Sequence, residues 1–170
     1  MDTNVIGEDD VIMRLAGVAP GGAAYRALLG RADIMAMTRE AAAAALLPQD
    51  PGGLSHAERA ALAVRVARLH DDAGLAGYYE TLMVKAGAEG PVGALADPAF
   101  KGGHDARRAA LIAYADLVSL APKDTVAGDI GALKAAGIAD ADIVRLAELT
   151  AFLAYQIRVI AGLRLMQATA

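Results

Sequence analysis

Three side chains that could perform acid–base chemistry lie close together near the middle of the sequence: His70, Asp72 and Tyr79. An imidazole, a carboxylate and a phenol can supply a base, an acid and a hydrogen-bond donor to a small carbonyl acid. The spacing of Asp72 and Tyr79 places both on one face of a helix. Arg158, far along the chain, could hold a substrate carboxylate beside them. A pocket built from these four residues is therefore one hypothesis.

The same residues also have structural interpretations. An aspartate in front of a helix accepts hydrogen bonds from free backbone N–H groups, so Asp72 would serve as an N-cap. A tyrosine at helical spacing usually packs at the edge of a core, as Tyr79 would. Only the convergence of the side chains in a reachable pocket separates these interpretations from the catalytic one.

Several classes of chemistry are excluded by composition. The chain has no cysteine, so it has no thiolate nucleophile and no thiolate metal ligand. The histidines, His56, His70 and His104, are far apart and form no paired metal motif. Glycine-rich motifs for phosphates or dinucleotides are also missing. We therefore expect neither a metal nor a cofactor.

Charge and hydropathy limit the partners. The formal net charge of -4 argues against nucleic acid, which requires clustered Lys and Arg. The acidic N-terminus is unlike a secretory signal. The most apolar stretch, Leu149 to Leu163, contains Gln156 and Arg158 and is too short to span a bilayer. We expect a cytoplasmic protein with no membrane partner.

Hydrophobic periodicity and cap signals predict an all-α protein. Ser55 and Glu58 form a capping box that begins a helix ending near His70. Its buried stripe is Leu62, Val66 and Leu69, and the residues on its other sides include Arg59, Arg65 and Arg68. The longest irregular stretch is expected at residues 87–103. Helices are expected at about residues 10–18, 24–29, 32–47, 55–70, 72–85, 106–120, 126–136 and 140–167.

Three methionines could mark a binding surface near the N-terminus. Met13, Met35 and Met37 have flexible side chains of the kind that adapt to varied ligands. Methionine at helical spacing usually fills a core, however, and we interpret all three as core residues.

The last predicted helix is apolar on nearly every side beyond Leu149. Such a helix is usually central in its own domain or buried against another subunit. One domain of short helices can cover only part of it, so we expect a homo-oligomer, a dimer or a multiple of one, with this helix at the interface.

Four segments in the last two-thirds of the chain match a known family in their order and spacing. They are Leu54-Ser55-His56-Ala57-Glu58-Arg59, Ala63 to Leu69, Tyr114-Ala115-Asp116, and Leu133 to Asp140. Together they resemble the alkylhydroperoxidase AhpD and carboxymuconolactone decarboxylase superfamily. The resemblance implies an oligomeric, AhpD-like multi-helical bundle over residues 54–170, with residues 1–53 as an N-terminal helical extension of one compact unit.

The resemblance also locates the catalytic motif of that superfamily. Its members typically carry a Glu, a Cys-x-x-Cys and a His, and the matching positions here are Ala60, Asp72, Leu75 and Tyr79. A register shifted by two residues restores a Glu at position 58 but still supplies no cysteine. We therefore expect no thiol-dependent peroxidase activity, because no residue can form the sulfenic acid or disulfide.

Three functions remain after these exclusions. The first, which we rank highest, is a binding or accessory protein with an unidentified, possible small-molecule ligand. The second is a non-redox enzyme, of the decarboxylase, lactone or proton-transfer type, acting on a small carbonyl acid through His70, Asp72 and Tyr79. The third is a purely structural oligomer. A solvent-reachable pocket where these side chains meet would favour the enzyme, and a closed apolar core would favour either of the others.

Overall fold

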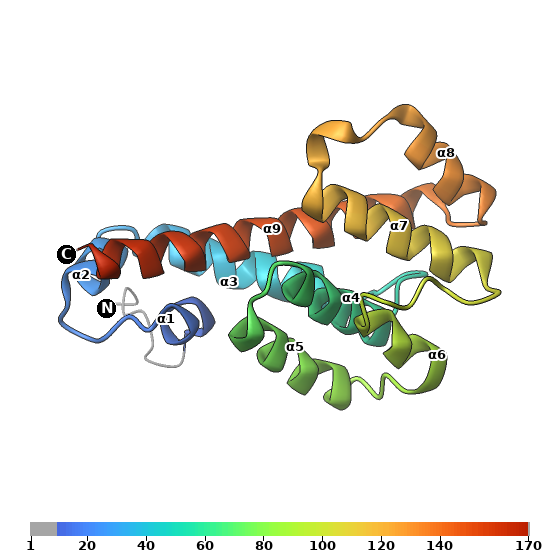
Figure 1. Cartoon of the computed structure of the whole chain (residues 1–170). Helices are drawn as coiled ribbons and strands as arrows, with labels where there is room; N and C mark the ends of the chain where they lie inside the picture. The colour runs from blue at the N-terminus through green and yellow to red at the C-terminus, as the bar shows by residue number, and fades with distance from the viewer. Residues whose placement is uncertain (1–9, 170) are drawn as a thin grey trace.

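The computed structural model describes residues 10–169, and the regular elements in that range are all helical (Figure 1). This confirms the predicted all-α class. The elements are α1 Val11–Ala16, α2 Ala23–Leu29, α3 Ala32–Leu46, α4 His56–Leu69, α5 Ala73–Lys85, α6 Gly90–Gly93, the 3₁₀ turn η1 Ala94–Ala96, α7 Ala106–Leu120, the 3₁₀ turn η2 Pro122–Asp124, α8 Ala127–Ala135 and α9 Asp140–Ala168.

Side-chain caps fix where the main helices begin. The capping box predicted for α4 is confirmed: the Glu58 amide donates to the Ser55 hydroxyl at 3.2 Å, and the Ser55 amide donates to the Glu58 carboxylate at 2.9 Å. Asp72 caps α5, and Asp105 caps α7. Each cap satisfies N–H groups that the first helical turn leaves free, so these boundaries follow from local sequence.

The segment expected to be the longest irregular stretch is partly helical. It contains the short helix α6 and the turn η1. Pro91 lies in the first turn of α6, where its missing N–H costs no hydrogen bond. Glycines and a proline close together are typical of a loop, but a proline in the first turn of a short helix gives the same sequence signal.

Helix α4 is the centre of the packing. Every residue from Ala60 to Ala67 is buried, and α3, α5, α7, α9 and η1 pack around it. Arg59 and Arg65 are 2% and 0% exposed, so the prediction that they lie outside the buried part of this helix is wrong. The alanines allow neighbouring helices to approach closely on all sides, which leaves little room for a solvated face.

Helix α9 runs along the length of the molecule (Figure 1). The helices α1, α2 and α3 pack on it towards the C-terminus, whereas α7 and α8 lie along its beginning. Residues on both sides of the expected boundary at position 54 belong to one continuous hydrophobic cluster. In the described range α9 alone is long and apolar enough, by length and composition, to cross a membrane, and 44% of its most apolar part is buried in the molecule.

Candidate functional site

Asp72 is held in an ion pair at the start of α5. One carboxylate oxygen accepts a hydrogen bond from the Leu75 amide at 3.0 Å, and the other lies 2.8 Å from the Arg164 guanidinium of α9. Arg164 also donates to the Leu15 carbonyl of α1, so it links these three helices. Burial raises the pKa of Asp72, but hydrogen bonds from Arg164 and Leu75 outweigh it and hold the pKa below its usual value. Asp72 is therefore an ionised structural carboxylate at neutral pH.

Tyr79 points into the core from the same helix. It is fully buried, and its hydroxyl donates to the side-chain oxygen of Gln156 on α9. Burial, together with the neighbouring Tyr78, raises the pKa of Tyr79 far above the usual value of a phenol. The phenol is therefore a neutral donor that has already found its acceptor.

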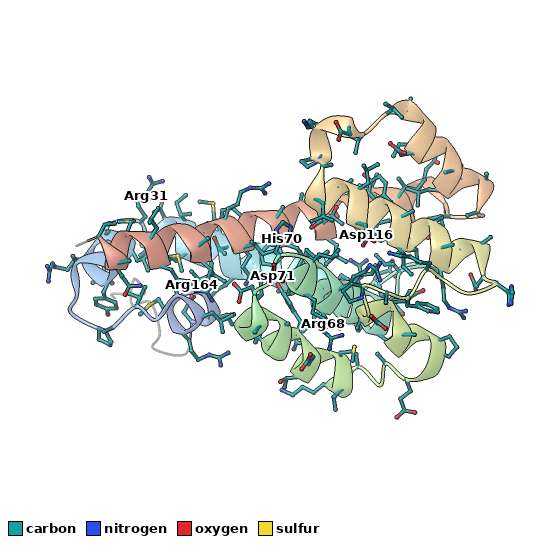
Figure 2. The ribbon with its side chains drawn as sticks, in the orientation of Figure 1. Arg31, Arg68, His70, Asp71, Asp116 and Arg164 are labelled. Atoms are coloured by element: carbon teal, nitrogen blue, oxygen red, sulfur yellow. The ribbon has the colours of Figure 1, made fainter. Side chains whose placement is uncertain are left out.

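The other two residues of the pocket hypothesis have different partners again. His70 caps the end of α4, and its Nε2 lies 2.8 Å from the Ser119 hydroxyl of α7. Arg158 is exposed and donates to the carbonyl of Ala154 in its own helix. Figure 2 shows His70 and Arg164, the partner of Asp72, at separate places along the molecule. Four cavities in the described residues are lined by other side chains.

The four positions that the sequence resemblance aligned with a catalytic motif are all buried. Ala60 is 3% exposed and Asp72 8%, while Leu75 and Tyr79 are sealed completely. Asp72 begins α5, and the other two follow on the inward face of that helix. This face supplies an aliphatic side chain, a paired carboxylate and a hydrogen-bonded phenol, and it holds no thiol.

Two buried arginines were missed by the sequence analysis. Both oxygens of Asp116 on α7 bind the guanidinium of Arg65, one of them at 2.7 Å, and backbone carbonyls between residues 95 and 100 accept its remaining hydrogens. Arg59 donates to three carbonyls between residues 45 and 54. Each arginine fastens a loop to α4. The available signal was the run of alanine, leucine and valine at residues 60–64 between the two arginines, which is wider than one buried stripe.

The largest hollow of these four is a groove of about 560 Å³ between α3 and α9. Its walls repeat at helical spacing on both helices. They are formed by Ile34, Met37, Thr38, Ala41, Ala44 and Ala45 of α3, and by Glu148, Ala151, Phe152 and Tyr155 of α9. Small alanine side chains make the hollow, and Glu148 is the charged residue among these walls.

One hydroxyl pair joins the two helices at the groove. The Thr38 hydroxyl donates to the Ile34 carbonyl at 2.8 Å, so the Tyr155 hydroxyl, 2.8 Å away, donates to Thr38. Both hydroxyl protons are therefore donated within the protein, and the other walls of the groove are mainly apolar. Such a pair would hold the register of α3 against α9.

Two of the three methionines near the N-terminus lie in the core, and the third is exposed. Met13 and Met35 are 1% and 2% exposed, which confirms their prediction as core residues. Met37 is 53% exposed and lines the groove, so its prediction as a core residue is wrong. The cause is its position on α3: Met35 turns inward, and a residue two places later points about 200° away around the helix.

Comparison with other proteins adds no identification. No protein-family model matches this sequence, and no curated protein is significantly similar to it. Within residues 10–169, His, Asp and Glu side chains form no cluster of three that could hold a metal ion.

Proposed function

We propose that this chain is a non-catalytic binding protein whose ligand, an elongated apolar molecule that is neutral or cationic, occupies the groove between α3 and α9. The groove itself carries the proposal. Its volume of about 560 Å³ lies within the roughly 300–1,000 Å³ of small-molecule sites, which are largely apolar with a few polar groups. Glu148 at its wall would repel an anion and attract a cation.

The arrangement of acid–base groups favours binding over catalysis. Asp72, Tyr79 and His70 each have a separate structural partner. The groove offers a carboxylate at Glu148 and two hydroxyls that are bonded to each other. Among the residues that the structure describes, no histidine, lysine or second carboxylate lines the groove beside Glu148. We also propose that the chain has the fold of the AhpD and carboxymuconolactone decarboxylase superfamily, which its sequence resembles, but lacks the thiol chemistry of that superfamily. A binding role is compatible with this.

A fluorescent apolar dye tests the groove. Nile red, which is neutral, should bind the wild type with increased emission. The change Ala44→Phe places a ring in the hollow and should weaken binding at least about tenfold, since it removes the volume that the dye needs. Ala43→Phe is the matched control, because Ala43 is an exposed neighbour on α3 that does not line the groove.

Three results would contradict this proposal. One is a wild type that leaves Nile red emission unchanged. Another is equal affinity in Ala44→Phe and the wild type, with both proteins folded by circular dichroism. Loss of binding in Ala43→Phe as well would also count against the groove, since it would show a general effect of an added phenylalanine on α3.

Self-association is a second candidate, favoured by the outer stripe of α9. This stripe consists of Val144, Glu148, Ala151, Tyr155 and Arg158, with all five side chains exposed. The negatively charged Glu148 precedes the small Ala151 in this stripe, and the positively charged Arg158 follows it. Two copies of α9 that pack antiparallel would set Glu148 of each copy against Arg158 of the other, which is the self-complementary pattern of a two-fold interface. The mass of the protein in solution tests it.

A further inference from the structure

A second, smaller cavity lies between helices α1, α3, α5 and α9. Its volume is about 130 Å³, and it shares Thr38 with the groove. The residues around it combine apolar walls with several polar groups. They are Asp10, Val11, Ile12, Thr38, Arg39, Ala42, Leu46, Tyr78 and Gln156.

Gln156 contributes a buried hydrogen-bond donor to this cavity. The side chain is 3% exposed, and its oxygen accepts the hydrogen bond of Tyr79. Because the Tyr79 phenol is neutral and donates, the amide nitrogen must lie on the other branch of the carboxamide. Among the described residues this nitrogen has no hydrogen-bond acceptor. Because no completely buried side-chain nitrogen or oxygen in that range lacks a partner, the amide nitrogen is not completely buried. Gln156 lines the cavity, so we infer that the nitrogen faces it.

Tyr78 adds a second donor. Burial raises the pKa of its phenol, with Arg14 opposing the effect and Asp10 adding to it, so the hydroxyl keeps its proton at neutral pH. Its ring packs against Tyr79 with the centroids 5.2 Å apart. In the described structure the Tyr78 hydroxyl makes no hydrogen bond to protein, so it is available to the cavity.

Arg39 supplies the positive charge, and the acidic residue beside it is already satisfied. One oxygen of Asp10 accepts from the Ile12 and Met13 amides at 3.0 and 3.3 Å, and the other lies 3.3 Å from Arg39. That contact uses one guanidinium nitrogen, and the side chain remains 49% exposed. Within the described residues, the cavity therefore offers unused donors from three side chains, and its buried carboxylate, Asp10, already accepts three hydrogen bonds.

We propose that this cavity binds a short-chain monocarboxylate, whose oxygens accept hydrogen bonds from the Gln156 amide, the Tyr78 hydroxyl and the Arg39 guanidinium. A cavity of about 150 Å³ holds benzene, so 130 Å³ fits about four to six non-hydrogen atoms. The apolar side chains of Val11, Ile12 and Leu46 then surround the alkyl part. A multiply charged oxyanion would leave those walls without an apolar partner.

Butyrate titrated into the full-length wild type by calorimetry tests the site. Tyr78→Phe removes one donor to a charged acceptor and should weaken binding about tenfold. Gln156→Glu keeps an acceptor for Tyr79 but replaces the amide donor with a carboxylate, so it should abolish binding. Tyr114→Phe is the matched control, because Tyr114 is a half-buried tyrosine on α7 that lines a different cavity.

The outcomes separate this site from the groove. Ala44→Phe should still bind butyrate, because Ala44 does not line the smaller cavity. Butyrate could also bind a wild type that does not bind Nile red, so the two proposals can fail independently. Absence of butyrate binding at millimolar concentrations would overturn the carboxylate site. Unchanged affinity in both folded site variants, or preferential binding of butylamine or inorganic phosphate, would overturn it as well.

Discussion

Arg65 shows what a buried charge requires in this molecule. Its guanidinium is fully sealed, and Asp116 is its one carboxylate partner among the described residues, with Oδ2 of Asp116 2.7 Å from Nη2 of Arg65. Removing one member of a buried ion pair leaves the other charge uncompensated, which is more costly than losing the attraction itself. The pair therefore matters for the loop at residues 95–100 and for the contact between α4 and α7.

Asp116→Asn should lower the free energy of unfolding by about 3–5 kcal/mol, because it leaves the buried Arg65 without its counter-charge. Urea denaturation measures this directly. Glu80→Gln is the control: it breaks the Arg68–Glu80 pair, whose side chains are 40% and 43% exposed, and should cost less than about 1 kcal/mol. Equal effects of the two changes would contradict the role given to burial.

The ion pair of Asp72 and Arg164 should make stability depend on acid pH. The pKa of Asp72 is lower in the folded chain than in the unfolded one. Its contribution is therefore complete above the unfolded pKa, about 4, and is lost as the pH falls through the folded pKa. Asp72→Asn cannot titrate, so its deficit relative to the wild type should be constant above about pH 5 and shrink below about pH 4. Urea denaturation across this range would contradict the prediction if the deficit stayed constant.

Among the elements, α4 is the one least tolerant of added volume. Ala63 is completely buried in the middle of this helix. Ala63→Leu should destabilise the protein by about 1–3 kcal/mol, because the close-packed neighbours must move to accept the larger side chain. Ala43→Leu on the exposed side of α3 provides the same change without burial. Thermal unfolding of both variants measures the difference, and a neutral Ala63→Leu would show that the packing around α4 is loose.

Element boundaries could be predicted from sequence where a local signal fixes them. Ser55 with Glu58, Asp72 and Asp105 each bond N–H groups within three residues, so a few letters decide the start of a helix. Burial of Arg65 could not be predicted in that way, since its acceptors lie about 30 to 50 residues away. Hydrophobic periodicity alone gives an arginine an outward position.

The candidate sites show the same limit. Neither cavity could be located from spacing, because each is made by helices that are distant in the sequence and meet at Thr38. In the sequence Gln156 only interrupts an apolar stretch, whereas in the structure it accepts the hydrogen bond of Tyr79 and lines a cavity. A polar residue inside an apolar helix was the available signal.

At the scale of the whole molecule, the exposed side of α9 bears on the expected homo-oligomer. Val144 is 57% exposed and Tyr155 38%, although α9 is buried along its other side by the remaining helices. Glu148 and Arg158 are separated by about 15 Å along the helix. In an antiparallel pair of α9 helices with its two-fold axis near residue 153, the two charges form two identical ion pairs across the interface.

A charge exchange distinguishes this pairing from a general apolar contact. Glu148→Lys should shift the mass measured by light scattering towards the monomer, because the introduced ammonium group would face Arg158 of the other copy and repel it. Adding Arg158→Glu to Glu148→Lys should restore the oligomer, since the exchanged charges attract in the same geometry. A monomeric wild type at tens of micromolar would contradict the pairing. An oligomer unaffected by Glu148→Lys would place the interface on another face, because a desolvated pair of like charges at the contact cannot leave the association constant unchanged.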